Sequence, residues 1–210
     1  PYPFTTIDAN FGIGYVRVEC VDKEFNVQCN PRFGYCINHT RFVPVQLIDV
    51  AGLVPDAHKG KGRGNKFLDD LRQADVLIHI VDMSGSTNEF GEPVKRLSHD
   101  PRKDIKFLEY EIDMWYLSIL KKGWDKFART IKSENLNIKK ELAKQLSGLN
   151  VNEDMVEHAI KKLKLNHDPV TWKEEELMQL ASELRKVSKP IIIAANKIDV
   201  EGSSYNLHII

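Results

Sequence analysis

The segment KPIIIAANKID, residues 189–199, places a run of apolar residues directly before the polar motif Asn196-Lys197-Ile198-Asp199. A continuous apolar run rich in Ile indicates a strand that is buried on both faces of a parallel sheet. In α/β folds, ligands bind at the carboxyl ends of such strands. The polar motif therefore stands where a sheet of this kind presents residues to a ligand.

The spacing N-K-x-D is the one that recognises guanine. The carboxylate of Asp199 can accept hydrogen bonds from the ring N–H and the exocyclic amine of guanine together. Adenine has no such pair of donors and would leave a buried carboxylate unpaired. We expect the stem of Lys197 to pack along the base and Asn196 to brace the loop. A polar loop after a strand is the alternative interpretation, and the position after an apolar strand favours the guanine site.

A second apolar run ends in a carboxylate within LIDVAGLVPDAHKGKGRGN, residues 47–65. Asp49 at such a strand end can hold a water on Mg²⁺, as the Asp of the corresponding strand does in phosphate-binding NTPases. Gly52 has no side chain, so its N–H can approach a γ-phosphate. Three glycines at every second position in residues 60–64 would let the following loop order and disorder with the phosphate. A plain glycine-rich connection is the alternative.

The segments around these motifs form a pattern of strands and helices. Strands are predicted at residues 11–20, 41–50 and 75–84, the last buried on both faces. A short helix is predicted at residues 65–74, with Phe67, Leu68 and Leu71 on one apolar face. Residues 21–40 are predicted to form an irregular insert or loose hairpin, and Pro44 indicates an edge strand or a strand start. The pattern predicts an α/β fold with a mostly parallel sheet.

A helical region from residue 104 to residue 186 separates the last two predicted strands. Thr171 to Glu174 reads as a capping box that opens the final helix. The region is too long for an ordinary crossover, so we expect an inserted helical subdomain at residues 104–186. The residues on either side, 1–103 and 187–210, are expected to form the nucleotide-binding part. Three apolar stripes, the first a coiled-coil-like seam, are Ile105, Leu108, Ile112, Trp115 and Ile119; Ile138, Leu142, Leu146 and Leu149; and Met155, Val156, Ala159, Ile160 and Leu163.

Composition restricts the setting of the protein more than its function. The 210 residues carry 30 Lys and Arg against 30 Asp and Glu, so net charge indicates neither a nucleic-acid nor a membrane partner. No apolar run approaches the roughly 20 residues that span a bilayer, and no secretory signal begins the chain. Three cysteines, an odd number, favour a reducing, cytoplasmic location over a disulfide framework.

Two clusters leave alternatives open. Cys20, Cys29, Cys36 and His39 could ligate zinc, but their intervals of eight, six and two residues do not match the close cysteine pairs of common structural sites. Zinc is therefore the minority interpretation. The segment Lys121–Lys144 holds eight Lys or Arg and three acids, which favours a solvated helix face, with RNA phosphates as an alternative partner.

Three stretches together carry a family resemblance. YPFTTID at residues 2–8, LIDVAGLVPDAHKGKGRGNKFLDDLRQADVLIHIVD at 47–82 and AANKID at 194–199, in this order, resemble the Obg family of GTPases. The long helical insert and GNKFLDDLRQAD at 64–75 look most like its YchF-like branch, in the archaeal type. The resemblance covers the chain from residue 2 to about 200. It implies a P-loop NTPase-type G domain that hydrolyses GTP to GDP and phosphate, in a translation- or ribosome-associated switch protein.

The resemblance also implies the roles of individual residues. Thr6 would ligate Mg²⁺, the expected cofactor, and Thr5 would lie beside it. Asp49 and Gly52 belong to the third GTPase motif, and residues 196–199 form the fourth. The ligands would be GTP and GDP, and the helical insertion would contact the ribosome or RNA.

Leu53 stands where Ras-type enzymes carry the Gln that orients the attacking water. Leucine cannot hydrogen-bond a water, so the resemblance implies that backbone or a bound monovalent cation such as K⁺ places it. His58 is an alternative, although a solvent-facing loop histidine is the simpler interpretation. The residues expected at the reacting phosphate are thus Asp49, Gly52 and Leu53.

Two departures from the family matter. The phosphate-binding motif G-x-x-x-x-G-K-[ST] is absent, because Gly60-Lys61-Gly62 has Pro55 in place of the upstream glycine and lacks the final hydroxyl. In the family this motif precedes YPFTT, and a fifth motif and a TGS domain follow residue 210, so we expect a truncated piece that is inactive alone. Many YchF-like members have a changed fourth motif and prefer ATP, whereas this chain keeps N-K-x-D, which favours GTP. The alternative function is a ribosome- or RNA-binding module with a vestigial nucleotide site.

Overall fold

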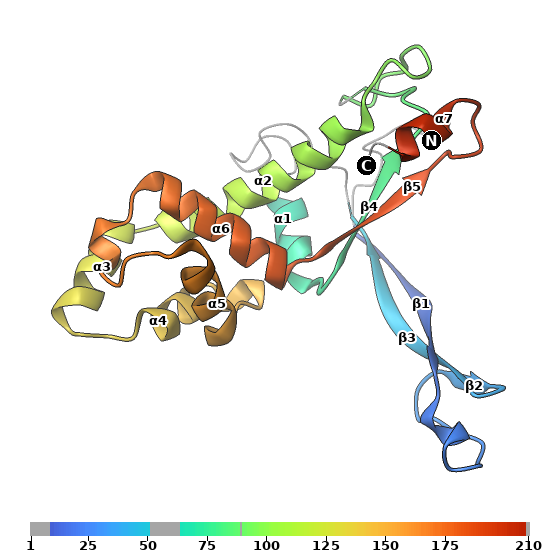
Figure 1. Ribbon diagram of the computed structural model, residues 1–210, viewed down its shortest axis with the longest axis horizontal. Helices are drawn as coiled ribbons and strands as arrows, with labels where there is room; N and C mark the ends of the chain where they lie inside the picture. The colour runs from blue at the N-terminus through green and yellow to red at the C-terminus, as the bar shows by residue number, and fades with distance from the viewer. Residues whose placement is uncertain (1–8, 51–63, 89, 209–210) are drawn as a thin grey trace. The chain divides into compact units, whose positions relative to one another are not determined.

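The computed structural model describes residues 9–50, 64–88 and 90–208 (Figure 1). The described residues form two compact units, one up to residue 50 and one from residue 64 onward, and each is described by itself. The predicted division at residues 104 and 186 stays a prediction. Several residues that the sequence analysis singled out lie outside the described residues, namely Thr5, Thr6, Gly52, Leu53, Pro55, His58, Gly60, Lys61 and Gly62.

The first unit is an antiparallel sheet of three strands in the order β1-β3-β2. β1 (Asn10–Glu19) pairs along its whole length with β3 (Thr40–Asp49), and β2 (Tyr35–Ile37) pairs with the beginning of β3. A 3-10 turn, η1 (Val21–Lys23), follows β1. The two predicted strands and the loose hairpin between them are confirmed.

Pro44 does not make β3 an edge strand, so that prediction was wrong. β3 is central in the sheet, and Pro44 lies opposite Tyr15 of β1. On its other side β3 pairs with β2 only over residues 40–42. No described strand pairs with Pro44 on that side, so its missing N–H leaves no ladder hydrogen bond unmade there.

The second unit contains a parallel pair of strands. β4 (Leu77–Asp82) and β5 (Ile191–Asn196) pair in register, from Leu77 opposite Ile191 to Asp82 opposite Asn196. Among the described strands only this pair is parallel, whereas the prediction was a mostly parallel sheet.

The prediction that both strands are buried on both faces was wrong. Ile80 is 66% exposed and Ile192 is 58% exposed, whereas Leu77 and Val81 are buried. Side chains alternate between the two faces of a strand, so one face of β4 is packed and the other is open. The helix α2 (Pro101–Lys121) contacts β4.

The remaining helices include those predicted from the apolar stripes of residues 138–149 and 155–163, and also helices at residues 124–133 and 203–207 that were not predicted. They are α1 (Gly64–Gln73), α3 (Trp124–Ser133), α4 (Ile138–Gln145), α5 (Glu153–Leu163), α6 (Glu174–Ser188) and α7 (Ser203–Leu207), with 3-10 turns η3 (Ser147–Leu149) and η4 (Pro169–Thr171). Phe67, Leu68 and Leu71 are buried on α1, as predicted. The helical region begins at residue 101 rather than 104, because the Asp100 carboxylate caps α2 by accepting the N–H of Arg102 at 3.0 Å.

α2 and α6 pack side by side along much of their length (Figure 1). Ile112 and Trp115 of the predicted seam are buried, while the seam residues nearer the helix ends are half-buried. A buried ion pair joins the two helices, with Arg185 Nε donating to Asp113 Oδ1 at 2.7 Å. Such a pair is costly to break because it leaves one charge buried without a partner.

The predicted capping box at Thr171 was wrong by two residues. Asp168 caps a separate 3-10 turn, which Thr171 ends, so α6 begins only at Glu174. The side chain of Glu176 accepts a hydrogen bond from the N–H of Lys173 at 2.8 Å, so the capping box lies at Lys173 and Glu176 instead. Among the helices of the described ranges, none is long and apolar enough to cross a bilayer.

Candidate functional site

The carboxyl end of β5 opens into a tight turn that carries the N-K-x-D motif. Lys197 has a φ of 58°, in the left-handed region that few non-glycine residues adopt. The side chain of Asn196 accepts the N–H of Lys197 at 2.9 Å, and the N–H of Val200 donates to the carbonyl of Lys197 at 3.2 Å. These two bonds hold the backbone of the motif in one conformation.

Asp82, at the carboxyl end of the neighbouring strand β4, is the anchor of this loop. It is in register with Asn196, and its Oδ2 accepts a hydrogen bond from Lys197 Nζ at 2.8 Å. It also accepts from the N–H of Ser84 at 2.9 Å and from Thr87 Oγ1 at 2.8 Å. Burial by itself would raise the pKa of Asp82, but the bonds from Lys197, Ser84 and Thr87 lower it from 3.8 to about 2. The carboxylate is therefore ionised at neutral pH and fixes the lysine side chain.

The sequence analysis missed Asp82 and its loop, although a signal was present. The letters DMSGST at residues 82–87 place two serines and a threonine directly after a strand that ends in Asp. Gly85 has a φ of 54°, and a Cβ built on it would lie 2.5 Å from the carbonyl oxygen of His99. Glycine is thus needed for the hydroxyl groups to fold back onto the carboxylate.

We expect Asp82→Asn to lower the free energy of unfolding at pH 7 by about 1 kcal/mol, after allowance for solvent screening of the half-exposed Lys197. Because folding depresses the pKa of Asp82, its contribution is full above pH 3.8 and is lost as the pH falls toward 2. Urea unfolding of wild type and variant between pH 7 and pH 3 measures this. Asp69→Asn, an exposed carboxylate 3.5 Å from Arg72, is the control. If the difference in free energy of unfolding between wild type and Asp82→Asn grows below pH 4, the stabilising role of the Asp82 carboxylate is contradicted.

α7 ties the loop after β5 to the end of β4. The buried amide of Asn206 donates to the carbonyl oxygen of Met83 at 2.8 Å, and Ser203 Oγ donates to the carbonyl oxygen of Ile198 at 2.7 Å. The ends of both strands are therefore one hydrogen-bonded scaffold. Asp199 projects from it as an exposed residue, and its carboxylate has no hydrogen bond or ion pair with the residues that the structure describes.

Asp49 lies at the carboxyl end of β3, opposite Asn10 of β1, and is exposed. It belongs to the first unit, whereas Asn196, Lys197 and Asp199 belong to the second, where one loop brings the three together. The other expected site residues fall outside the described ranges. Their roles therefore stay predictions.

A strand that ends in N-K-x-D beside a parallel partner, together with another strand that ends in D-x-x-G, defines an α/β protein of the G-domain class. Residues 1–114 match the family model described as 50S ribosome-binding GTPase. The chain belongs to this family of GTPases and is a YchF-like member of the Obg type.

Three similar proteins illustrate the match. An uncharacterized GTP-binding protein from Methanocaldococcus jannaschii is 54% identical over 98% of this chain and 51% of its own length. The ribosome-binding ATPase YchF of Bacillus subtilis is 31% identical over 93% of this chain and 48% of its own length. The crystal structure of a GTP-binding protein from Pyrococcus horikoshii OT3 matches with a TM-score of 0.79 and 42% identity, over 93% of this chain and 52% of that one. The chain thus spans about half the length of the relatives it matches.

Proposed function

We propose that the protein binds GTP and hydrolyses it to GDP and phosphate, as a switch protein that acts on the ribosome in the cytoplasm. The observation that carries the proposal is the loop after β5. Its backbone is fixed by Asn196 and its lysine by Asp82, while the carboxylate of Asp199 is exposed and unpaired among the described residues. Membership of a GTPase family supports the reaction.

The fixed lysine favours guanine recognition by preorganisation. The ion pair between Lys197 Nζ and Asp82 Oδ2 holds both ends of the lysine stem before any base arrives. A side chain that is already ordered loses little conformational entropy on binding, so more of the contact energy appears as affinity. Asp199 then supplies the two acceptors that distinguish guanine from adenine.

Asp49 fits the proposed role beside Mg²⁺. Mg²⁺ prefers oxygen ligands and keeps several waters, and an exposed carboxylate at a strand end can hold one of those waters. Thr6 would supply a further oxygen ligand, with Thr5 beside it, and the N–H of Gly52 would contact the γ-phosphate. When bound, the ion neutralises charge on the phosphate oxygens. A monovalent cation such as K⁺ is the proposed substitute for the glutamine that Leu53 replaces.

In the complete gene product, Asp49→Ala should lower the rate of single-turnover GTP hydrolysis by about 10–100-fold, the usual cost of losing an outer-sphere partner of a metal. Leu53→Ala should leave most of the rate, because leucine cannot orient water by hydrogen bonding. The rates are compared at saturating Mg²⁺. A larger loss for Leu53→Ala than for Asp49→Ala would overturn the two roles.

A ribosome- or RNA-binding module with a vestigial nucleotide site is the second candidate, and the basic segment supports it only in part. Four of its cations are paired with carboxylates, namely Lys121, Lys132, Lys139 and Lys144. Four others are exposed and have no carboxylate partner among the described residues, namely Lys122, Lys126, Arg129 and Lys140. Half of the charge is therefore free for phosphates. Ribosome binding by a gene product that cannot bind any nucleotide would favour this candidate.

A further inference from the structure

Four side chains with metal-ligating atoms converge at one end of the antiparallel sheet. They are Cys20, Asp22, Cys29 and Cys36, and their sulfur and carboxylate oxygen atoms all lie within 4.8 Å of one another. Cys20 and Asp22 are buried, and the other two are half-buried. The sequence intervals disfavoured zinc because no two of the cysteines form a close pair. His39 was considered there as the fourth ligand, whereas the structure puts Asp22 in that place.

The fold brings these residues together from three separate segments. Cys20 follows the last residue of β1, and its N–H donates to the carbonyl oxygen of His39 at 2.8 Å. Asp22 lies in η1, and its Oδ2 accepts the N–H of Cys29 at 2.7 Å. Cys36 lies in β2, opposite Arg41 of β3. The sheet and the loops thus fix each ligand independently.

The turns around the cluster are built from residues that suit a left-handed backbone. Asn26, Asn38 and His39 have φ values of 52°, 48° and 61°. Gly34 has a φ of 72°, and a Cβ built on it would lie 2.1 Å from the carbonyl oxygen of Phe42. Asn38 and His39 are the two central residues of the hairpin turn between β2 and β3, where Ile37 pairs with Thr40, and positive φ at both positions is the favoured geometry of such a turn. This turn places His39 beside Asp22 without any need for an ion.

One distance in the cluster already matches that of a tetrahedral zinc site. Zinc binds thiolate at about 2.3 Å and carboxylate oxygen at about 2.1 Å, so a sulfur and an oxygen on one tetrahedron lie about 3.6 Å apart. Sγ of Cys36 lies 3.6 Å from Oδ2 of Asp22. Two sulfurs on one tetrahedron lie about 3.8 Å apart. The cluster, which spans up to 4.8 Å, therefore needs to contract by about 1 Å on binding.

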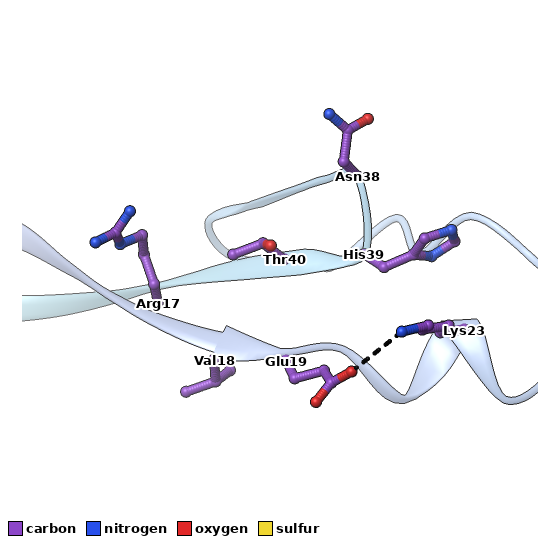
Figure 2. Close-up of a pocket in the computed structure, with 7 residues that line it drawn as sticks. All are labelled: Arg17, Val18, Glu19, Lys23, Asn38, His39 and Thr40. Carbon is purple, nitrogen blue, oxygen red and sulfur yellow. Dashed lines mark ion pairs between the residues drawn. The ribbon is translucent and has the colours of Figure 1, made fainter.

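Neighbouring groups complete the environment that such an ion requires. Nδ1 of His39 lies 2.9 Å from Oδ1 of Asp22 and holds the carboxylate in the way outer partners hold metal ligands. Zn²⁺ with three thiolates and a carboxylate carries surplus negative charge, part of which the nearby cation of Arg41 offsets. Figure 2 shows a pocket that Lys23 and His39 both line, and in it Lys23 pairs with Glu19 at 3.5 Å.

We propose that Cys20, Asp22, Cys29 and Cys36 bind one Zn²⁺ ion, which fixes the end of the β1-β3-β2 sheet. A disulfide would use only two of the three sulfurs and would leave the buried carboxylate beside an unused thiol. A zinc ion uses all four groups. The site is separate from the guanine motif, so its existence does not depend on the proposed GTPase activity.

The test is metal content and cobalt spectroscopy of the 210-residue chain, purified under reducing conditions. We expect one zinc per chain, and tetrahedral thiolate absorption when Co²⁺ replaces it. Cys29→Ser and Cys36→Ser should each weaken metal binding by roughly 100-fold or more, and His39→Ala by about 10–100-fold. Glu19→Gln, which changes a carboxylate that is 80% exposed, is the matched control and should bind normally.

Asp22→Cys separates a ligand from a residue that only shapes the loop. If Asp22 ligates the ion, a fourth thiolate keeps the stoichiometry and strengthens the cobalt–thiolate absorption. If Asp22 only accepts loop hydrogen bonds, the same change leaves that absorption unaltered or abolishes binding. The proposal is also overturned if fully reduced chain takes up no zinc at micromolar free Zn²⁺, or if two of the cysteines form a disulfide in the purified chain.

Discussion

In the complete gene product, Asp199→Asn is expected to weaken GTP binding by about 10²–10⁴-fold. The carboxylate accepts two hydrogen bonds from guanine, and a bond to a charged group contributes roughly 1.5–3 kcal/mol. Asparagine keeps one neutral acceptor but sets its NH2 group against the exocyclic amine of guanine, so the loss of the two charge-assisted bonds removes about 3–6 kcal/mol, at 1.4 kcal/mol per tenfold change in affinity. The amide of asparagine offers one donor and one acceptor, which matches the carbonyl and ring N–H of xanthine. The variant should therefore favour xanthosine triphosphate.

Competition against a labelled nucleotide measures this change. In wild type, unlabelled GTP should displace labelled GTP far better than ATP, and in the variant xanthosine triphosphate should displace it best. Glu201→Gln is the control, because this carboxylate lies in the same loop, is 95% exposed and only approaches Arg96 at 3.8 Å. Equal displacement by ATP and GTP in wild type, or unchanged GTP affinity in Asp199→Asn, would refute guanine recognition by this loop.

Local patterns in the sequence were enough to locate the elements that carry the site. β3 and β5 end at Asp49 and Asn196, as the apolar runs predict, because a strand stops where its hydrophobic pattern stops. The apolar face of α1 was equally clear from the spacing of Phe67, Leu68 and Leu71. Comparisons with known proteins then support the G-domain class that these motifs indicated.

Features that depend on contacts between residues far apart in the chain could not be predicted from the sequence. Asp82 and Lys197 are 115 positions apart, and only the pairing of β4 with β5 shows that the carboxylate anchors the guanine motif. The sequence could not show which side chains gather around the cysteines for a related reason. The intervals between the cysteines match no common zinc site, and Asp22, whose carboxylate lies within 4.8 Å of the three sulfurs, has no distinctive spacing in the sequence. The open face of β4 likewise depends on which element covers it, and a run of apolar letters cannot show that.

The 210-residue chain by itself is expected to bind GTP at least a thousandfold more weakly than the complete gene product. The motif G-x-x-x-x-G-K-[ST] does not occur in it, although it carries the guanine loop and Asp49. In proteins with that motif, several backbone N–H groups and a lysine surround the β- and γ-phosphates. Three such charge-assisted bonds contribute about 4.5 kcal/mol or more, which is over a thousandfold in affinity.

Exposed apolar side chains add a second reason for weak binding. Ile78, Ile80 and Ile192 are each more than half exposed on β4 and β5, directly beneath the loops of the site. Exposed apolar surface of this kind promotes association, so we expect the isolated chain to be poorly soluble and its helical region to be the most independent part. Looser strands would also hold Lys197 and Asp199 less firmly.

Titration of the purified chain with a fluorescent GTP analogue in Mg²⁺ shows whether tight binding requires the phosphate-binding motif G-x-x-x-x-G-K-[ST]. The complete gene product and its Asp199→Ala variant are measured in parallel, so that weak binding of the short chain is not confused with failure of the guanine loop. If the short chain saturates in the low micromolar range and Asp199→Ala abolishes this binding, other residues replace the phosphate-binding motif. Weak binding by both proteins would instead refute the proposed GTPase function, because the guanine loop is common to them. The expected result is weak binding by the short chain and tight, Asp199-dependent binding by the complete product. Only this result fits a site in which one segment recognises the base and another binds the phosphates.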